Sequence, residues 1–192
     1  MADDLGLEPA EVHAKAREVL GFWFDLVMPE QRFAKSDSLD HEIRTLFGPL
    51  RDLVLGSGAM AWRDDPETLL AAVILLDQFS RNVHRGSAEA FAGDPLAQAL
   101  TLEAIERGWD VGMPQDHRIF LYMPLMHAED PELQTLSVEC FCEPELERNL
   151  DYARDHADVI ARFGRFPTRN EALGRDSTPE EKAYLSQPGA GW

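Results

Sequence analysis

Apolar residues recur at the 3.6-residue spacing of an α-helix along nearly the whole chain, and no other feature constrains the fold as strongly. Val12, Ala16, Val19 and Trp23 follow this spacing, and residues 39–54 repeat it. No segment shows the apolar–polar alternation of a convincing β-strand. The sequence therefore predicts an all-α protein, built from antiparallel helical hairpins that stack as a bundle or a short solenoid.

Capping residues and prolines mark where these helices begin and end. Asp before Pro is a typical helix start, because the carboxylate caps the first turn and proline fits the first helical position. Pro124 lies inside a predicted helix and predicts a kink or a break there. The expected starts are Asp65-Pro66, Asp94-Pro95, Gln115, Pro131, Pro144 and the capping box Thr178-Pro179-Glu180-Glu181, and the expected ends include Gly56, Asn82, Gly108 and Gly164.

Length and charge restrict the class of protein further. A chain of 192 residues can bury a sufficient core as a single domain spanning residues 1–192. Its net charge of −17 opposes binding to nucleic acid. Cys140 and Cys142 are interpreted as small apolar helix residues, and their Cys-x-Cys spacing predicts neither a disulfide nor a metal site. Two thiols without a disulfide pattern predict a reducing, cytoplasmic location. No apolar stretch is long enough for a membrane span. No cofactor is expected.

The helix expected after Pro66 is apolar around most of its circumference, which is typical of a central helix. Asp77 and Arg81 project onto the same face as its apolar residues, and Gln78 and Asn82 form a second i, i+4 pair beside them. We expect Asp77 and Arg81 to be buried. They form either a clamp that fixes how the neighbouring helices dock or the floor of a pocket.

Histidines and acids gather near two other helices. His156 projects inward from the helix expected after Pro144, where a core histidine and a site histidine are both possible. His127, Glu129 and Asp130 follow the helix that contains Pro124, and Asp130 is also placed to cap the helix that Pro131 opens. Their spacing does not match a zinc-binding signature.

Residues 162–170 form a basic, aromatic segment, so the local charge there is positive although the chain as a whole is strongly acidic. Its arginines include Arg165 and Arg169, and Asn170 follows them. Such arginines grip a ligand carboxylate or phosphate, or neutralise the protein's own acids, and the sequence leaves both interpretations open.

Several ordered blocks together resemble a bacterial family known as domain of unknown function family 924. The resemblance covers nearly the whole chain and implies a tetratricopeptide-like fold of stacked helical hairpins, without implying an activity. The chain departs from the family pattern at Ser80, Ala128 and Thr168, where proline, serine and histidine are usual. The matching blocks are residues 20–24, 75–82, 85–86, 90–91, 94–97, 122–130, 162–170 and 174–178.

Three hypotheses of function follow. The first is a binding module with a pocket for an anionic small molecule or peptide. The second is a hydrolase in which His127 or His156 acts as general base and Asp77 or Glu129 orients it. The third is a purely structural polar network. The first hypothesis predicts that three distant stretches meet at one concavity, with the candidate residues Asp77, Gln78, Arg81, Asn82, Arg85, His127, Glu129, Asp130, His156, Arg165, Arg169 and Asn170.

Overall fold

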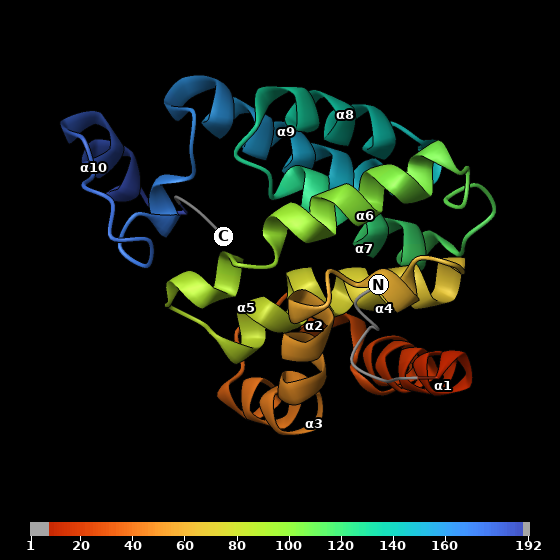
Figure 1. The fold of residues 1–192 in the computed structure, drawn as a ribbon. Coiled ribbons are helices and arrows are strands. Elements are labelled where there is room, and N and C mark those ends of the chain that lie inside the picture. Colours follow the sequence, from red (N-terminus) through yellow and green to blue (C-terminus); the bar gives the residue numbers. More distant parts are fainter. Residues whose placement is uncertain (1–7, 190–192) are drawn as a thin grey trace. The chain divides into compact units, whose positions relative to one another are not determined.

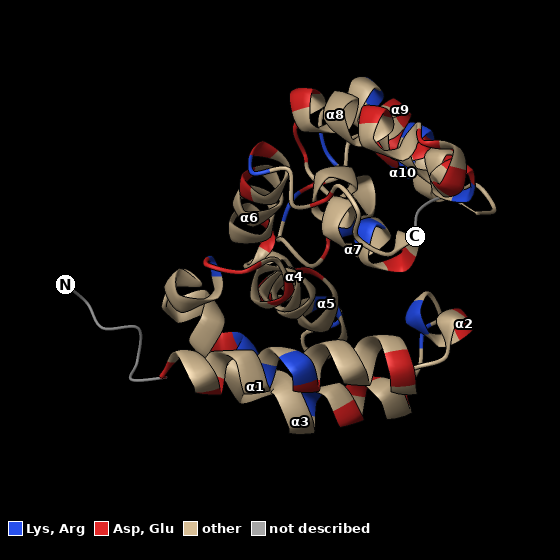
Figure 2. Cartoon of the chain, turned by 90° about the vertical axis from the view of Figure 1, so that its right-hand side faces the viewer, with Lys and Arg blue, Asp and Glu red and all other residues tan. Residues whose placement is uncertain are grey.

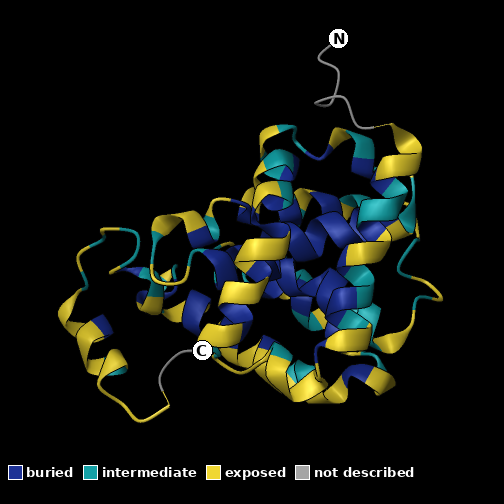
Figure 3. Ribbon diagram, turned by 90° about the horizontal axis from the view of Figure 1, so that it is seen from below, coloured by how far each residue is buried: buried dark blue, intermediate teal, exposed yellow. Residues whose placement is uncertain are grey.

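The apolar run Leu69–Leu76 lies in a helical stretch that spans residues 66–83, and every residue of this run is buried in the computed structural model. The stretch consists of α4 (Pro66–Ile74), the π-helical turn η3 (Leu75–Phe79) and α5 (Ser80–Val83). Asp65 caps it as expected, accepting hydrogen bonds from the backbone N–H groups of Glu67 (2.8 Å) and Thr68 (3.3 Å). Figure 3 colours each residue by its burial, with the buried residues in dark blue.

The structure describes residues 8–189, which form helices and no strand, so the predicted all-α class is confirmed. Two compact units divide them, a first unit of residues up to 85 together with 89–124, and a second unit of residues 86–88 and from 125 onward. The single-domain organisation and the tetratricopeptide-like stacking stay predictions. No helix within residues 8–189 combines the length and apolar character of a membrane span.

The first unit is built around the central helix (Figure 1). The helix α1 (Pro9–Leu20) packs against α4, α3 (Asp37–Gly56) packs against η3 and α5, and α6 (Asp94–Glu106) packs against α4 and η3. An aromatic core joins them, in which the rings of Trp23 and Phe47 lie 5.4 Å and 5.1 Å from that of Phe79. The remaining elements are η1 (Gly21–Leu26), α2 (Pro29–Arg32), η2 (Met60–Trp62), η4 (Ala88–Phe91), whose first residue belongs to the second unit, and α7 (Gln115–Met126), whose last two residues belong to the second unit.

The helix α7 continues through Pro124 and ends at Met126, so of the expected kink or break the break does not occur, and the kink stays a prediction. Proline removes one backbone donor, and the helix tolerates this loss close to its end. The hydroxyl of Thr101 on α6 donates to the carbonyl of Leu121, near the same point (2.8 Å).

The second unit contains α8 (Pro131–Phe141) and α9 (Glu147–Phe163), which lie side by side as a hairpin (Figure 1). Gly164 ends α9 with a positive φ of 69°, a conformation that glycine adopts without strain. The expected capping box is also present, since Thr178 accepts from the N–H of Glu181 at the start of α10. Two short 3-10 turns, η5 (Pro144–Leu146) and η6 (Pro167–Arg169), and the helix α10 (Pro179–Leu185) complete the unit.

The helix α6 begins one residue earlier than the sequence predicts, which corrects the expected role of Asp94. Gly93 is the N-cap, and Asp94 is the first helical residue, with its carboxylate bound to Arg81. Gly93 lies directly against the central helix, where an added Cβ atom would stand only 2.6 Å from the carbonyl oxygen of Leu76. The missing side chain at position 93 therefore sets how closely α6 approaches η3.

We predict that Gly93→Ala destabilises the protein by about 1–3 kcal/mol, because the backbone of Leu76 cannot move aside cheaply. Urea unfolding of the two proteins measures this difference. Gly56→Ala is the matched control, since a Cβ atom there meets nothing within 4 Å. The control is expected to leave the free energy of unfolding unchanged or raise it by about 0.5 kcal/mol. Equal stabilities for Gly93→Ala and wild type would contradict the close approach.

Candidate functional site

Asp77 and Gln78 lie on the π-helical turn η3, and both are buried. The amide of Gln78 donates to Oδ2 of Asp77 (2.6 Å) and contacts the sulfur of Met123 (3.3 Å). Asp77 is thus buried as the sequence predicts. A π-helical turn adds one residue to the helix and rotates the residues after it by about 100°, so a simple projection of the faces does not extend beyond it.

Arg81 is held between two carboxylates of the first unit. Its Nη1 lies 2.9 Å from Oδ1 of Asp77, and its two terminal nitrogens donate to the two carboxylate oxygens of Asp94 (3.0 and 3.1 Å). The Arg81 side chain retains 21% exposure, so it is less deeply buried than expected. Burial opposes the charged guanidinium, but Asp77 and Asp94 outweigh that effect and raise the pKa of Arg81.

Asn82 and Arg85 converge on a carboxylate that the sequence reasoning missed. Asp40 on α3 accepts from the amide of Asn82 (2.7 Å) and from Nε and Nη2 of Arg85 (2.6 and 2.8 Å). Burial alone would raise the pKa of Asp40, but the bonds from Arg85 and Asn82 hold it below its usual value. Helical spacing could have revealed Asp40, because it lies three and seven residues before the buried Ile43 and Phe47.

In the second unit, Glu129 ties the chain after α9 to the end of α7. Its carboxylate oxygens accept from Nη1 and Nη2 of Arg175 (2.6 and 2.9 Å) and from the backbone N–H of Phe166 (2.7 Å). These bonds, together with the charge of Arg169, overcome burial and lower the pKa of Glu129. Asp130 caps α8 as expected, accepting from the N–H groups of Glu132 and Leu133.

Arg165 and Asn170 meet at Glu181, a second carboxylate that sequence reasoning did not select. Nε and Nη2 of Arg165 donate to the two oxygens of Glu181 (2.7 and 2.9 Å), and the Asn170 amide lies 3.3 Å from one of them. The bonds from Arg165, aided by the N–H of Thr178, lower the pKa of Glu181 from its ordinary 4.5 to about 2. This cluster holds the irregular segment after Gly164 against α10.

His127 and His156 also come together in the second unit, with ring centroids 6.1 Å apart. His156 is buried as expected, and its Nδ1 lies 2.7 Å from the carbonyl oxygen of Tyr152. Arg169 donates to the carbonyl of His127 (2.8 Å), while its guanidinium lies 4.6 Å from the ring centroid of Phe166.

The candidate residues therefore form separate clusters within each unit. Asp77, Gln78, Arg81, Asn82 and Arg85 belong to the first unit, and the other seven belong to the second. A single concavity shared by both groups stays a prediction. Figure 2 shows that acidic and basic residues are interspersed along the helices of both units, as expected where arginines neutralise nearby acids.

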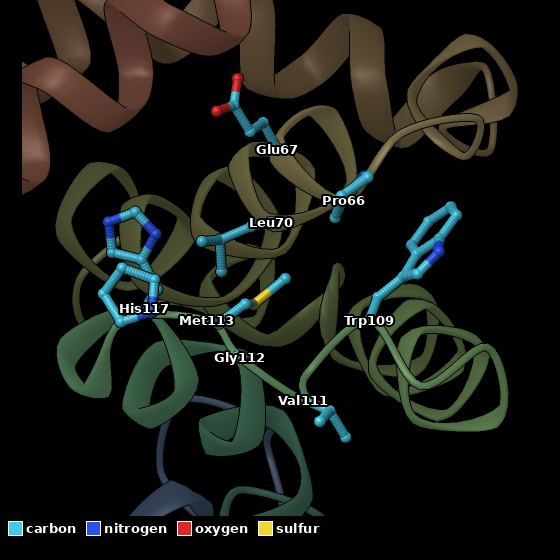
Figure 4. A pocket seen from close by; sticks show the side chains of 9 residues that line it. Pro66, Glu67, Leu70, Trp109, Val111, Gly112, Met113 and His117 are labelled. Atoms are coloured by element: carbon cyan, nitrogen blue, oxygen red, sulfur yellow. The ribbon is translucent and has the colours of Figure 1, made fainter.

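A pocket that the sequence reasoning missed lies in the first unit, where the segment between α6 and α7 crosses the start of α4 (Figure 4). Its volume is about 350 Å³. Loop residues supply much of its wall, and loops carry no periodic signal from which a sequence could reveal them. The lining residues are Pro66, Glu67, Leu70, Trp109, Val111, Gly112, Met113, Pro114 and His117.

Two aromatic side chains, His117 and Trp109, stand on opposite sides of this pocket (Figure 4), and each contacts another side chain of the first unit. The imidazole of His117 stacks on Phe24 with centroids 4.2 Å apart, and the guanidinium of Arg32 lies 5.3 Å from the centroid of Phe24. The guanidinium of Arg107, which does not line the pocket, lies 4.6 Å from the ring centroid of Trp109. These contacts restrain the two rings.

Comparison with known proteins places this all-helical chain in a family. The family described as "Bacterial protein of unknown function (DUF924)" matches residues 19–189, and the chain belongs to it. It is similar to a solved structure of a protein of unknown function, ATU0120, from Agrobacterium tumefaciens, with a TM-score of 0.83 and 36% identity over 92% of this chain and 99% of that chain. Comparison with curated proteins found no match.

We predict that Asp77→Ala lowers the free energy of unfolding by about 3 kcal/mol, because Arg81 loses one of its two carboxylates in a largely buried position. Chemical denaturation monitored by circular dichroism gives the value. Glu18→Ala, which removes an exposed partner of Lys15, is the control and is expected to cost less than about 1 kcal/mol. An unchanged midpoint for Asp77→Ala would mean that Asp94 alone satisfies Arg81.

Glu181 predicts a specific loss of stability in acid. Its pKa is lower in the folded protein, so the ionised carboxylate stabilises the fold above pH 4.5, and this contribution disappears as pH falls toward about 2. The urea midpoint of Glu181→Gln should therefore change less between these pH values than that of wild type. Glu180→Gln, at an exposed neighbour, should follow the wild-type curve. Parallel curves for all three proteins would contradict the role of Glu181.

Proposed function

We propose that this chain is a binding protein, and that its ligand occupies the apolar pocket beside Trp109 and His117 in the first unit. The observation that carries the proposal is the pair of supported aromatic walls across a pocket of about 350 Å³. Small-molecule sites are typically concavities of roughly 300–1,000 Å³, mostly apolar, with a few polar groups that orient the ligand. Leu70, Met113 and Val111 supply the apolar surface, and Glu67 and His117 supply the polar groups.

The arginine clusters support a structural role better than an anion site. Arg81, Arg85 and Arg165 each donate two hydrogen bonds to a carboxylate of their own unit. A ligand carboxylate or phosphate would have to displace an intramolecular partner that is always present, and the displaced acid would then lie unpaired in a poorly solvated place. We infer that these clusters hold helices and loops together.

The lining of the pocket contains no hydroxyl, thiol or amine nucleophile, because its nine residues include no serine, threonine, cysteine or lysine. In the hydrolase hypothesis Asp77 or Glu129 would orient a histidine, but Asp77 is paired with Arg81, and Glu129 is engaged by Arg175 and the N–H of Phe166. Preformed aromatic walls reduce the entropy cost of binding, which is what a binding site requires.

We predict that Trp109→Ala weakens the binding of indole, used as a neutral apolar probe, by about tenfold, because one wall of the pocket is removed. Isothermal titration calorimetry measures the dissociation constant. Trp109→Phe keeps an aromatic wall and should retain most of the affinity.

The control for this test is Leu46→Ala, which removes an exposed apolar side chain on α3 that does not line the pocket. It should leave the dissociation constant unchanged, and the melting temperatures of all variants should show that they are folded. Equal binding of indole by Trp109→Ala and by wild type would contradict the proposal.

A further inference from the structure

The charged residues around the pocket favour a ligand with a positive charge. Glu67 is the charged residue among the nine that line it, and neither lysine nor arginine is present in that set. Glu67 lies in the first turn of α4 and is exposed. In Figure 4 its carboxylate stands at the rim, beyond Leu70. An exposed glutamate changes rotamer at little cost and can turn toward a bound cation.

His117 lies in a predominantly acidic environment. Burial lowers the pKa of its imidazole, with help from the charge of Arg32, while Asp116, Glu67 and Asp25 act in the opposite direction. The ring is therefore neutral at pH 7, and one of its nitrogens can accept a hydrogen bond. The three carboxylates near His117 outnumber the one nearby guanidinium, that of Arg32, so the electrostatic potential on this side of the pocket is negative.

The donors of the nearby arginines are directed to groups of the protein and not to the pocket. Arg32 donates to the backbone carbonyls of Phe24 (2.8 Å) and Val27 (3.3 Å). Arg107 pairs with Glu103 (2.6 Å) and donates to the carbonyl of Arg63 (2.9 Å). An anionic ligand would thus meet a carboxylate at the rim without a guanidinium directed toward it.

We propose that the ligand is a small amphiphilic amine, with an apolar ring that lies against Trp109, Leu70 and Met113 and an ammonium group that pairs with Glu67 and donates to His117. This inference rests on the proposed function and names the ligand class of the same pocket. The two ends of the pocket differ in chemistry as such a ligand requires. Figure 4 shows the Trp109 indole on one side of the pocket, the His117 imidazole on the opposite side and the Glu67 carboxylate at the rim, directed away from Leu70.

Three probes that share one ring test this inference: tryptamine carries an ammonium group, indole is neutral, and indole-3-propionate carries a carboxylate. Calorimetry at pH 7 is expected to give tryptamine a dissociation constant at least about fivefold below that of indole, and indole-3-propionate one above it. Glu67→Gln should abolish the preference for tryptamine over indole. Glu42→Gln removes the same charge from an exposed position on α3 and should retain the preference.

The outcomes separate the two proposals. If indole binds and the three probes have equal affinities, or if Glu67→Gln retains the preference for tryptamine, the amine inference is wrong and the pocket remains a binding site. If indole-3-propionate binds most tightly, the sign of the ligand charge is wrong. If none of the probes binds to folded wild-type protein, the proposed function and the inference both fail.

Discussion

The first unit depends on the guanidinium of Arg81, which joins the central helix to α6. The carboxylates of Asp77 on η3 and Asp94 at the start of α6 both pair with the guanidinium of Arg81, which lies between them. Two acids in a poorly solvated place would otherwise repel each other, and one of them would have to take up a proton. Gly93 completes this junction by removing the side chain that would hold the helices apart. The ion pair and the glycine together fix where α6 begins.

The second unit repeats this principle where regular structure is sparse. Residues 164–178 contain the short turn η6 and otherwise follow an irregular path, so they lack the continuous backbone hydrogen bonds of a helix. Arg165 and Arg175 compensate by binding Glu181 and Glu129 through paired donors. Bidentate arginine–carboxylate pairs restrict direction as well as distance, and this restriction gives an irregular segment a defined course.

The sequence revealed the features that depend on local spacing. The burial of Asp77 and His156, the caps at Asp65, Asp130 and Thr178, and the end of α9 at Gly164 all follow from residues a few positions apart. Features that depend on distant contacts were missed or misassigned. Asp94 was interpreted as a cap because its partner Arg81 lies in another helix, and the pocket was missed because its walls combine a loop with two helix starts. The π-helical turn at η3 has no signature in apolar periodicity.

The pairing of arginines within each unit has a consequence for how the molecule meets its surroundings. The chain has 35 acidic residues and 18 lysines and arginines, and several of those cations are committed to internal carboxylates. The opposite charges of each such pair largely cancel at a distance. The electrostatic field outside the protein is therefore dominated by the acidic residues that have no basic partner. At low ionic strength this negative field concentrates cations near the protein. Added salt weakens the effect, because it shortens the Debye length, which is about 8 Å at physiological ionic strength. The rate at which a charged molecule reaches the protein is therefore a property of the buffer as much as of the binding site.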